Sequence, residues 1–303
     1  MPKTTPLARR KFLKGAGLAG LTFAARPGAL DAAAPAASKR KICAFIKFIQ
    51  ELPYKQLAET VAELGFDGIE ATVRKGGHVL PERVEDDLPK LVEALKGVGL
   101  EITVMASSVN SLAQPDTRKV LKTAAALGVK RYRLAYYRYD TKRPILEQLN
   151  ALKPVLRDLT AFHRELGLQG VYQNHAGASS VGAPVWDLQR LMEGYPACDL
   201  AIAFDIRHAT VEGGLAWPLH FQVAQPHLGA IYVKDFNWDK DRKPVNVPLG
   251  TGQVNPRFFS LLRQSSFSGP ISLHVEYLPK GGVAANIAAL KNDLATLRRL
   301  LVS

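Results

Sequence analysis

The stretch Glu63–Glu70, with the sequence ELGFDGIE, shows how this chain is organised. It ends a segment in which Leu57, Val61 and Leu64 recur at helical spacing, so that one face of a helix is apolar. Gly65 then supplies the left-handed conformation that often ends a helix, and an apolar segment typical of a strand begins at once. The stretch therefore predicts a helix that leads directly into a strand.

The same junction recurs further along the chain. It is found at Val98-Gly99-Leu100, Ala126-Leu127-Gly128-Val129 and Glu165-Leu166-Gly167-Leu168. The four glycines are 34, 29 and 39 residues apart, which is the length of one strand, one helix and their loops. We expect eight strands, near residues 41–47, 67–72, 101–106, 131–136, 169–174, 200–205, 229–234 and 271–276.

Eight strand–helix units within residues 38–303 indicate an α/β fold, the (β/α)8 TIM barrel, as a single domain. An open doubly wound sheet is the alternative, and it usually carries a glycine-rich phosphate loop after its first strand. Residues 47–51 follow the first expected strand here and read KFIQE, without glycine. The barrel is therefore the favoured architecture.

The composition is that of a globular protein, but the charge is unusual. Of 303 residues, 47% are hydrophobic and only two are cysteine, which excludes a disordered chain and a small disulfide-built domain. Lys and Arg number 40 against 27 Asp and Glu, a net charge of +13. Residues 1–37 hold six bases and one acid, which leaves +8 for the remainder, spread without a run of bases. We therefore expect no nucleic-acid partner.

The N-terminal segment resembles a twin-arginine export signal. Arg9-Arg10-Lys11-Phe12-Leu13-Lys14 precedes an uncharged run at 15–25, and small residues at 32–37 offer A-x-A cleavage sites. The uncharged run is too short to cross the roughly 30 Å hydrocarbon core as a helix, so we expect no stable membrane anchor. Residues 1–37 are thus the expected signal peptide, the twin-arginine export machinery an expected partner, and the periplasm the expected location.

Polar side chains gather where the expected strands end. The clusters are Glu70–Arg74 with His78 after it, Gln173–His175, Asp205–His208, Lys234–Trp238 and His274–Tyr277. Because the carboxyl ends of the strands meet on one face of a TIM barrel, these clusters should form one site.

These residues resemble the xylose-isomerase-like barrel superfamily of sugar isomerases and epimerases, which also includes endonuclease IV. The resemblance extends from Ile42 to the C-terminal helix. Its motifs are Gly65–Glu70, Asn174-His175, Asp205-x-x-His208, Lys234-Asp235, Gly250-Thr251-Gly252 and Glu276. The chain looks most like exported members of the sugar phosphate isomerase/epimerase type.

The resemblance implies one divalent metal. In these epimerases it is held by a Glu that ends strand five, an Asp of strand six, a His of strand seven and a Glu of strand eight. The two glutamates pass the substrate's proton from one face of the carbon to the other. Asp205 and Glu276 match the Asp and the second Glu, whereas Gln173 and Tyr232 replace the other two ligands.

These replacements bear on the mechanism. An amide cannot accept a proton at neutral pH, so Gln173 cannot be a general base. A phenol with a pKa of about 10 is a poor metal ligand, so Tyr232 should weaken metal binding further. The remaining expected ligands of a divalent cation (Mn, Mg, Co or Zn) are Asp205, Glu276, His208 and His274.

We predict a sugar isomerase or epimerase-like enzyme that removes a proton next to a carbonyl group of a small carbohydrate. Glu276 is the expected base, and His208 holds substrate or metal. Lys234 and His175 are expected to stabilise the developing enolate charge. The expected substrate-binding residues are Glu70, Arg74, His78, Asn174, Gln173 and Trp238.

Two other functions stay open. A lyase or dehydratase acting on a keto-sugar needs a single base, which suits the loss of a Glu at position 173. A barrel that has lost its catalysis and only binds carbohydrate is the other. An abasic-site endonuclease is disfavoured, because that chemistry in this superfamily uses three zinc ions and more His and acidic ligands than are found here. The number of subunits is left open, and an oligomer is one possibility.

Overall fold

Eight parallel strands close into a barrel in the computed structural model of the chain, which describes residues 40–303. Around the barrel their order is β1-β10-β7-β6-β5-β4-β3-β2, and β1 pairs with β2 to close the ring. The barrel strands are β1 (Ile42–Phe45), β2 (Gly68–Val73), β3 (Ile102–Ser107), β4 (Arg131–Arg133), β5 (Gln169–Gln173), β6 (Leu200–Asp205), β7 (Leu228–Val233) and β10 (Ile271–Leu273). All eight coincide with expected strands, and the predicted TIM barrel is confirmed.

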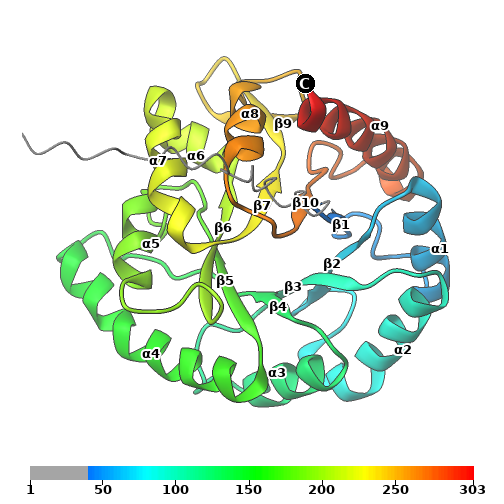
Figure 1. Ribbon diagram of the computed structural model, residues 1–303, viewed down its shortest axis with the longest axis horizontal. Coiled ribbons are helices and arrows are strands. Elements are labelled where there is room, and N and C mark those ends of the chain that lie inside the picture. Colours follow the sequence, from blue (N-terminus) through cyan, green and yellow to red (C-terminus); the bar gives the residue numbers. More distant parts are fainter. Residues whose placement is uncertain (1–39) are drawn as a thin grey trace, which may run out of the picture. The chain divides into compact units, whose positions relative to one another are not determined.

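Helices surround this barrel as an outer ring (Figure 1). The α-helices are α1 (Tyr54–Leu64), α2 (Val84–Gly97), α3 (Thr117–Ala126), α4 (Ile145–Leu166), α5 (Val185–Met192), α6 (Ile206–Gly213), α7 (Trp217–Ala224), α8 (Arg257–Gln264) and α9 (Gly282–Val302). Short 3-10 helices lie at Pro81–Arg83, Gly214–Ala216 and Gln225–His227.

The glycine junctions behave as the sequence predicts. Gly65 has φ 85° and Gly167 has φ 64°, and each caps the C-terminus of the helix before it, α1 and α4. Gly99 and Gly128 also have positive φ, at 75° and 89°. A side chain with a β-carbon is disfavoured in this region, so the repeated glycine lets each helix turn back toward the sheet.

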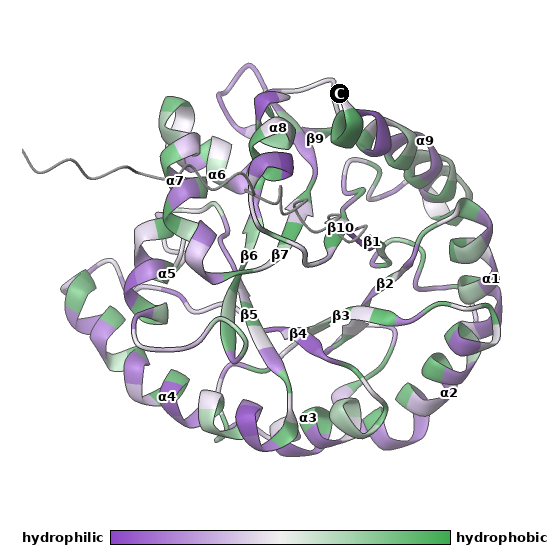
Figure 2. Ribbon diagram, viewed as in Figure 1, coloured by the Kyte–Doolittle hydropathy of each residue, from purple (hydrophilic) through white to green (hydrophobic). Residues whose placement is uncertain are grey.

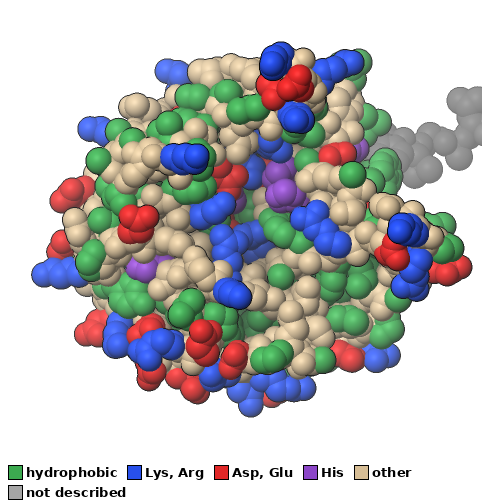
Figure 3. All heavy atoms as spheres, turned by 180° about the vertical axis from the view of Figure 1, so that it is seen from behind, with side chains coloured by type: hydrophobic (Ala, Val, Ile, Leu, Met, Phe, Trp, Pro, Cys, Tyr) green, Lys and Arg blue, Asp and Glu red, His purple; other side chains and the backbone are tan. Residues whose placement is uncertain are grey.

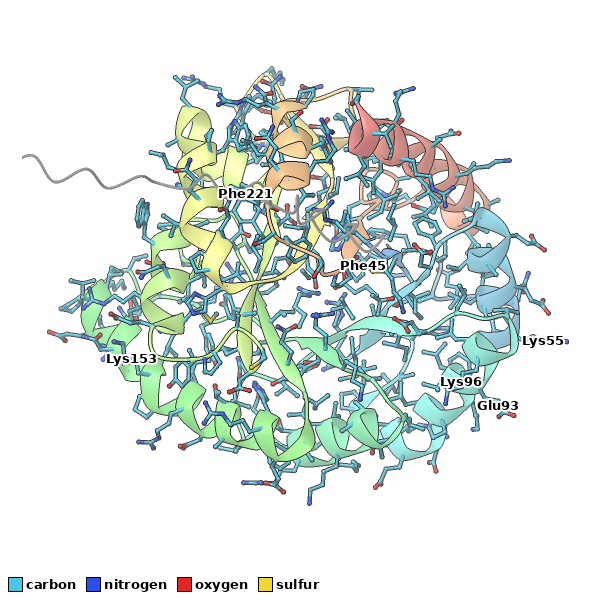
Figure 4. The ribbon with its side chains drawn as sticks, viewed as in Figure 1. Phe45, Lys55, Glu93, Lys96, Lys153 and Phe221 are labelled. Carbon is cyan, nitrogen blue, oxygen red and sulfur yellow. The ribbon has the colours of Figure 1, made fainter. Side chains whose placement is uncertain are left out.

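Apolar side chains fill the space between the helices and the barrel. In Figure 2, green and purple alternate along the ring of helices, as expected for helices with one apolar face. Figure 4 shows Lys55 and Lys153 pointing outward from α1 and α4, whereas Phe45 and Phe221 lie inside the ring. Both phenylalanines are buried.

The interior of the barrel holds a second, smaller apolar cluster. Its members are Val104, Val171, Ala201, Ala203, Ala230 and Tyr232. Because side chains alternate between the two faces of a strand, the next inward position lies two residues further on. That position is Gln173 after Val171, Asp205 after Ala203, and Lys234 after Tyr232. The barrel interior therefore changes from apolar to polar toward the carboxyl ends of its strands.

A two-stranded antiparallel hairpin outside the barrel was not predicted. It consists of β8 (Asp235–Trp238) and β9 (Pro244–Val247). The Asp235 carboxylate accepts hydrogen bonds from the backbone N–H groups of Gly250, Gly252 and Val254, each at 3.0 Å. The Gly-Thr-Gly motif is thus a loop held by the first residue of β8.

Within residues 40–303, no helix has the length and apolar character needed to cross a membrane. The predicted signal peptide at residues 1–37 lies outside the described residues, so its export role stays a prediction.

Candidate active site at the barrel mouth

The polar residues at the strand ends line one opening of the barrel. From β1 to β7 the strands run clockwise in Figure 1, so right-handed crossovers place their carboxyl ends on the face turned away from the viewer. Figure 3 shows that face, where Lys, Arg and His side chains gather around a central hollow. We call this opening the barrel mouth, and its central residues are Glu70, Arg133, Gln173, Asp205, Lys234 and Glu276.

Glu70, from β2, is fully buried and has a donor on each side. Its carboxylate lies 3.2 Å from Arg133 Nε, 2.6 Å from Ser272 Oγ and 2.9 Å from His274 Nε2. Burial alone would raise the pKa of the Glu70 carboxyl, but these partners lower it to about 2. Glu70 is therefore ionised, and its carboxylate is already bound by side chains in the wall of the barrel mouth.

Gln173, at the end of β5, links the two sides of the mouth. Its Oε1 accepts from Arg133 at 2.9 Å and from the Tyr136 hydroxyl. Its Nε2 donates to Asp205 Oδ2 at 2.7 Å. The amide hydrogens thus point at Asp205, and the amide oxygen points away from it.

Lys234, directly after β7, joins the other two carboxylates. Its Nζ lies 3.3 Å from Asp205 Oδ2 and 3.0 Å from Glu276 Oε2. Burial opposes the charged form, but Asp205 and Glu276 raise the pKa of the Lys234 ammonium above its usual value. In return, Lys234 holds the pKa of Glu276 well below its usual range despite burial. The Glu276 side chain is 19% exposed, whereas that of Asp205 is fully buried.

Two histidines stack beside this ion pair. The rings of His175 and His208 are 4.0 Å apart, and His175 is also 4.8 Å from the Tyr136 ring. Burial and the nearby Lys234 charge lower the pKa of His175 to about 4 and that of His208 well below its usual value. Both rings are therefore neutral at pH 7. The His175 Nδ1 lies 2.9 Å from its neighbour's carbonyl, Ala176 O, which leaves Nε2 as an acceptor.

Two guanidinium groups add positive charge at the rim. Arg74 lies over the Phe45 ring at 5.9 Å. Arg207 contacts His208 Nδ1 and the Pro244 carbonyl, both at 3.1 Å. Within the described part of the chain, neither of these arginines makes an ion pair with a carboxylate, so cations exceed anions at the barrel mouth.

Three of the predicted substrate-binding residues have other contacts. Asn174 is fully buried and ties β5 to β6, because its amide donates to Asp205 O at 3.1 Å and accepts from Asp205 N at 2.7 Å. The His78 ring lies 3.1 Å from Leu52 O. Trp238 is half-exposed on β8 and packs edge-on against Phe236. The structure does not bring these three side chains into the central cluster.

The family of this chain is decided by its sequence profile. The profile of the family described as "Xylose isomerase-like TIM barrel" matches residues 58–300. The chain belongs to this family. A sequence comparison with curated proteins gives no match.

Solved structures of similar shape include other barrels of this kind. The probable 3-DHS dehydratase AsbF of Bacillus anthracis superposes with a TM-score of 0.66 at 16% identity, covering 86% of this chain and 98% of its own. The 3-keto-D-glucoside 4-epimerase YcjR of E. coli gives 0.65 at 17% identity, covering 86% of this chain and 100% of its own. A putative xylose isomerase of Rhodospirillum rubrum gives 0.66 at 17% identity, covering 84% and 99%. At these identities the likeness concerns the fold.

The barrel mouth of this xylose isomerase-like protein does not fit a divalent cation. Among residues 40–303, no three or more His, Cys, Asp or Glu side chains are grouped so as to hold a metal. The four predicted ligands are divided: His274 binds Glu70, and the Lys234 ammonium lies between Asp205 and Glu276. His208 Nε2 is 3.6 Å from Asp205 Oδ2. The expectation of a metal held by these four residues is therefore not met by the observed geometry.

Sequence reasoning missed several residues of the barrel mouth. These are Arg133, Tyr136, Arg207 and Ser272. Arg133 could have been recognised from the sequence, because an arginine within a barrel strand that faces inward needs an acidic partner. Which acid pairs with it depends on contacts across the barrel, from β4 to β2, and these are not visible in the local sequence.

Proposed function

We propose that this protein is a sugar-modifying enzyme that removes a proton next to a carbonyl group, with Glu276 as the base. The observation that carries the proposal is the Glu276–Lys234 pair at the barrel mouth, with 3.0 Å between Oε2 and Nζ. Of the three carboxylates in the mouth, Glu276 is the one that is partly exposed, so a bound substrate can reach it.

The neighbouring charges suit the formation of an enolate. Lys234 is protonated and nearly buried, so its N–H donors can face a substrate oxygen on which negative charge develops. A substrate oxygen that accepts a hydrogen bond from Lys234 weakens the ion pair between Lys234 and Glu276. The lowered pKa of Glu276 then rises toward the range in which a carboxylate accepts a proton from carbon.

A reaction that needs one base fits this site better than a symmetric epimerisation. Gln173 stands opposite with no group that can accept a proton. In an elimination, the proton goes to Glu276 and the C–H electron pair forms an enolate, whose oxygen carries the negative charge. When the carbonyl forms again, this pair becomes the new C=C bond as the C–O bond to the leaving group breaks with its electrons on oxygen. That oxygen takes a proton from the Tyr136 hydroxyl, whose raised pKa keeps it protonated, and the proton on Glu276 is returned to Tyr136 through solvent. An aldose–ketose isomerisation also needs only one base and is the second candidate.

Proton abstraction can be tested by isotope exchange. Purified protein is incubated in D2O with D-fructose, D-tagatose, D-allulose or a 3-keto-D-glucoside, and deuterium uptake and product formation are followed by NMR. We expect uptake beside the carbonyl of at least one of these ketoses and a loss of about 100-fold or more in Glu276→Gln. Glu147→Gln, an exposed change on α4, is the control and should match the wild type.

The test also separates an enzyme from a carbohydrate-binding barrel. Calorimetry measures binding of the same sugars to the wild type. Binding without deuterium uptake would contradict the proposed catalysis, and unchanged uptake in Glu276→Gln would contradict the assignment of the base.

A further inference from the structure

We propose that the ammonium group of Lys234 takes the place of a divalent cation between Asp205 and Glu276, so that the barrel mouth functions without a metal. This inference concerns the charge of the mouth and does not depend on which reaction the protein catalyses.

The strand order places Lys234 between the two carboxylates. β7 lies between β6 and β10 in the barrel, and Tyr232 of β7 is in register with Asp205 on one side and with Ser272 on the other. Lys234 lies two residues beyond Tyr232 and Glu276 lies four residues beyond Ser272, so both come after this register, toward the barrel mouth. Lys234 Nζ therefore reaches Asp205 at 3.3 Å and Glu276 at 3.0 Å, and only 5% of its side chain is exposed.

Donors already occupy three of the roughly four lone-pair sites of the Asp205 carboxylate, including both on Oδ2. Asp205 Oδ2 accepts from Gln173 Nε2 at 2.7 Å as well as facing Lys234. Asp205 Oδ1 accepts the backbone N–H of His208 at 3.1 Å. The oxygen of the Gln173 amide accepts from Arg133 and Tyr136, so the amide turns its hydrogens toward Asp205. A cation bound to Asp205 Oδ2 would therefore face these hydrogens and not the amide oxygen.

The two histidines among the expected ligands differ in their contacts. Nε2 of His208 lies 3.6 Å from Asp205 Oδ2 and has no hydrogen-bond partner among the described residues. Nε2 of His274 is already engaged. His274 lies 2.9 Å from Glu70 Oε2, and its Nδ1 is 4.0 Å from Glu276 Oε1. Tyr232 is fully buried, and burial raises the pKa of its phenol well above the usual value, so it stays neutral. A divalent ion in place of the ammonium would thus meet two carboxylates and one histidine nitrogen, that of His208, and would lack a fourth side-chain donor.

An ammonium differs from a metal ion in what it supplies. It carries one positive charge and three N–H donors, so it neutralises part of the charge of Asp205 and Glu276 and can still donate to a substrate oxygen. The positive charge between Asp205 and Glu276 therefore comes from a side chain of the polypeptide itself. It follows that chelators should leave the protein unchanged, and that removal of the ammonium should create a place for a divalent ion.

The test measures Mn2+ binding after dialysis against EDTA, by electron paramagnetic resonance of free Mn2+ and by the melting temperature. The wild type should bind no stoichiometric Mn2+ and should melt at the same temperature with and without the ion. Lys234→Ala should melt lower and should gain about 5 °C at a Mn2+ concentration about 100 times its Kd. Lys55→Ala, which removes an exposed lysine on α1, is the matched control and should show no Mn2+ response.

The double change Asp205→Asn with Lys234→Ala should abolish the Mn2+ response of the single variant. If Lys234→Ala does not fold, Lys234→Met keeps the apolar stem and replaces it in the test. One equivalent of Mn2+ bound by the wild type and lost in Asp205→Asn would overturn the inference. Lysine variants that fold without any gain in Mn2+ binding would overturn it too, because the ammonium would then not be what occupies the site.

Discussion

At the scale of single residues, Glu70 shows how the barrel mouth carries charge inside a buried site. Its carboxylate has no exposed surface, yet it meets Arg133, Ser272 and His274, which come from β4 and from β10 or directly after it. A buried charge is tolerated when its partners satisfy it, and removal of one partner leaves the others uncompensated. Glu70 therefore holds three barrel strands together at the site.

Glu70→Gln should destabilise the protein strongly. The amide keeps the shape but leaves the buried Arg133 guanidinium without its counter-charge, so we expect a loss of about 3–5 kcal/mol in the free energy of unfolding. Urea denaturation followed by circular dichroism measures it.

The control is Glu101→Gln, which breaks a half-exposed ion pair with Lys41. Such pairs contribute about 1 kcal/mol or less. A loss in Glu70→Gln no larger than that of the control would show that the buried pair does not hold the strands together.

At the scale of elements, one carboxylate, that of Asp235 at the start of β8, holds the loop that follows the β8–β9 hairpin. Asp235 Oδ2 accepts the N–H groups of Gly250 and Gly252, and Oδ1 accepts those of Phe236 and Val254. The sequence showed the Gly-Thr-Gly motif and the Asp but not their contact. The link spans 15 to 19 residues and forms only once the hairpin has brought the chain back beside the end of β7.

Asp235→Asn should loosen this loop. The new amide nitrogen cannot accept a hydrogen bond, so two backbone donors lose their acceptor, and we expect a loss of about 3 kcal/mol in the free energy of unfolding. Hydrogen exchange at Gly250 and Gly252 should become faster.

Asp239→Asn is the matched control on the same hairpin. Asp239 accepts the N–H groups of Asp241 and Lys243 through a single oxygen, which an asparagine retains. If both variants lost the same stability, the four contacts of Asp235 would not explain the order of the loop.

At the scale of the whole molecule, a buried histidine, His163, connects the helical ring to the barrel. His163 of α4 lies 2.6 Å from the Tyr132 hydroxyl of β4 and 2.9 Å from Asp199 O, the residue before β6. Burial lowers the pKa of His163 to about 4, so the neutral ring is the folded form. In the unfolded chain the ring has an ordinary pKa of about 6.5.

The free energy of unfolding should therefore depend on pH. Between pH 6.5 and 4 the unfolded state binds the proton and the folded state does not, so stability falls as the pH is lowered. Above about pH 6.5 this contribution is constant, and its full size is about 3 kcal/mol. Urea denaturation at pH 7, 5.5 and 4.5 measures it.

His163→Gln should flatten this dependence in part. His175 and His208 also have a lowered pKa and keep contributing in the same direction. The same slope with pH in the variant and the wild type would contradict the role given to His163.

What the sequence determined by itself is local. Four helix ends carry a glycine, the strands are short apolar segments, and five of the strand ends carry clusters of polar residues. These signals are local because capping and turn formation act over a few neighbouring positions. The eight strands, the barrel and the candidate site could be predicted from these signals. Which charged side chains pair with one another inside the site could not be predicted from them. That Arg133 meets Glu70, and that Lys234 lies between Asp205 and Glu276, is decided by barrel closure and register. These bring together positions 29 to 63 residues apart, in contacts that no local pattern encodes.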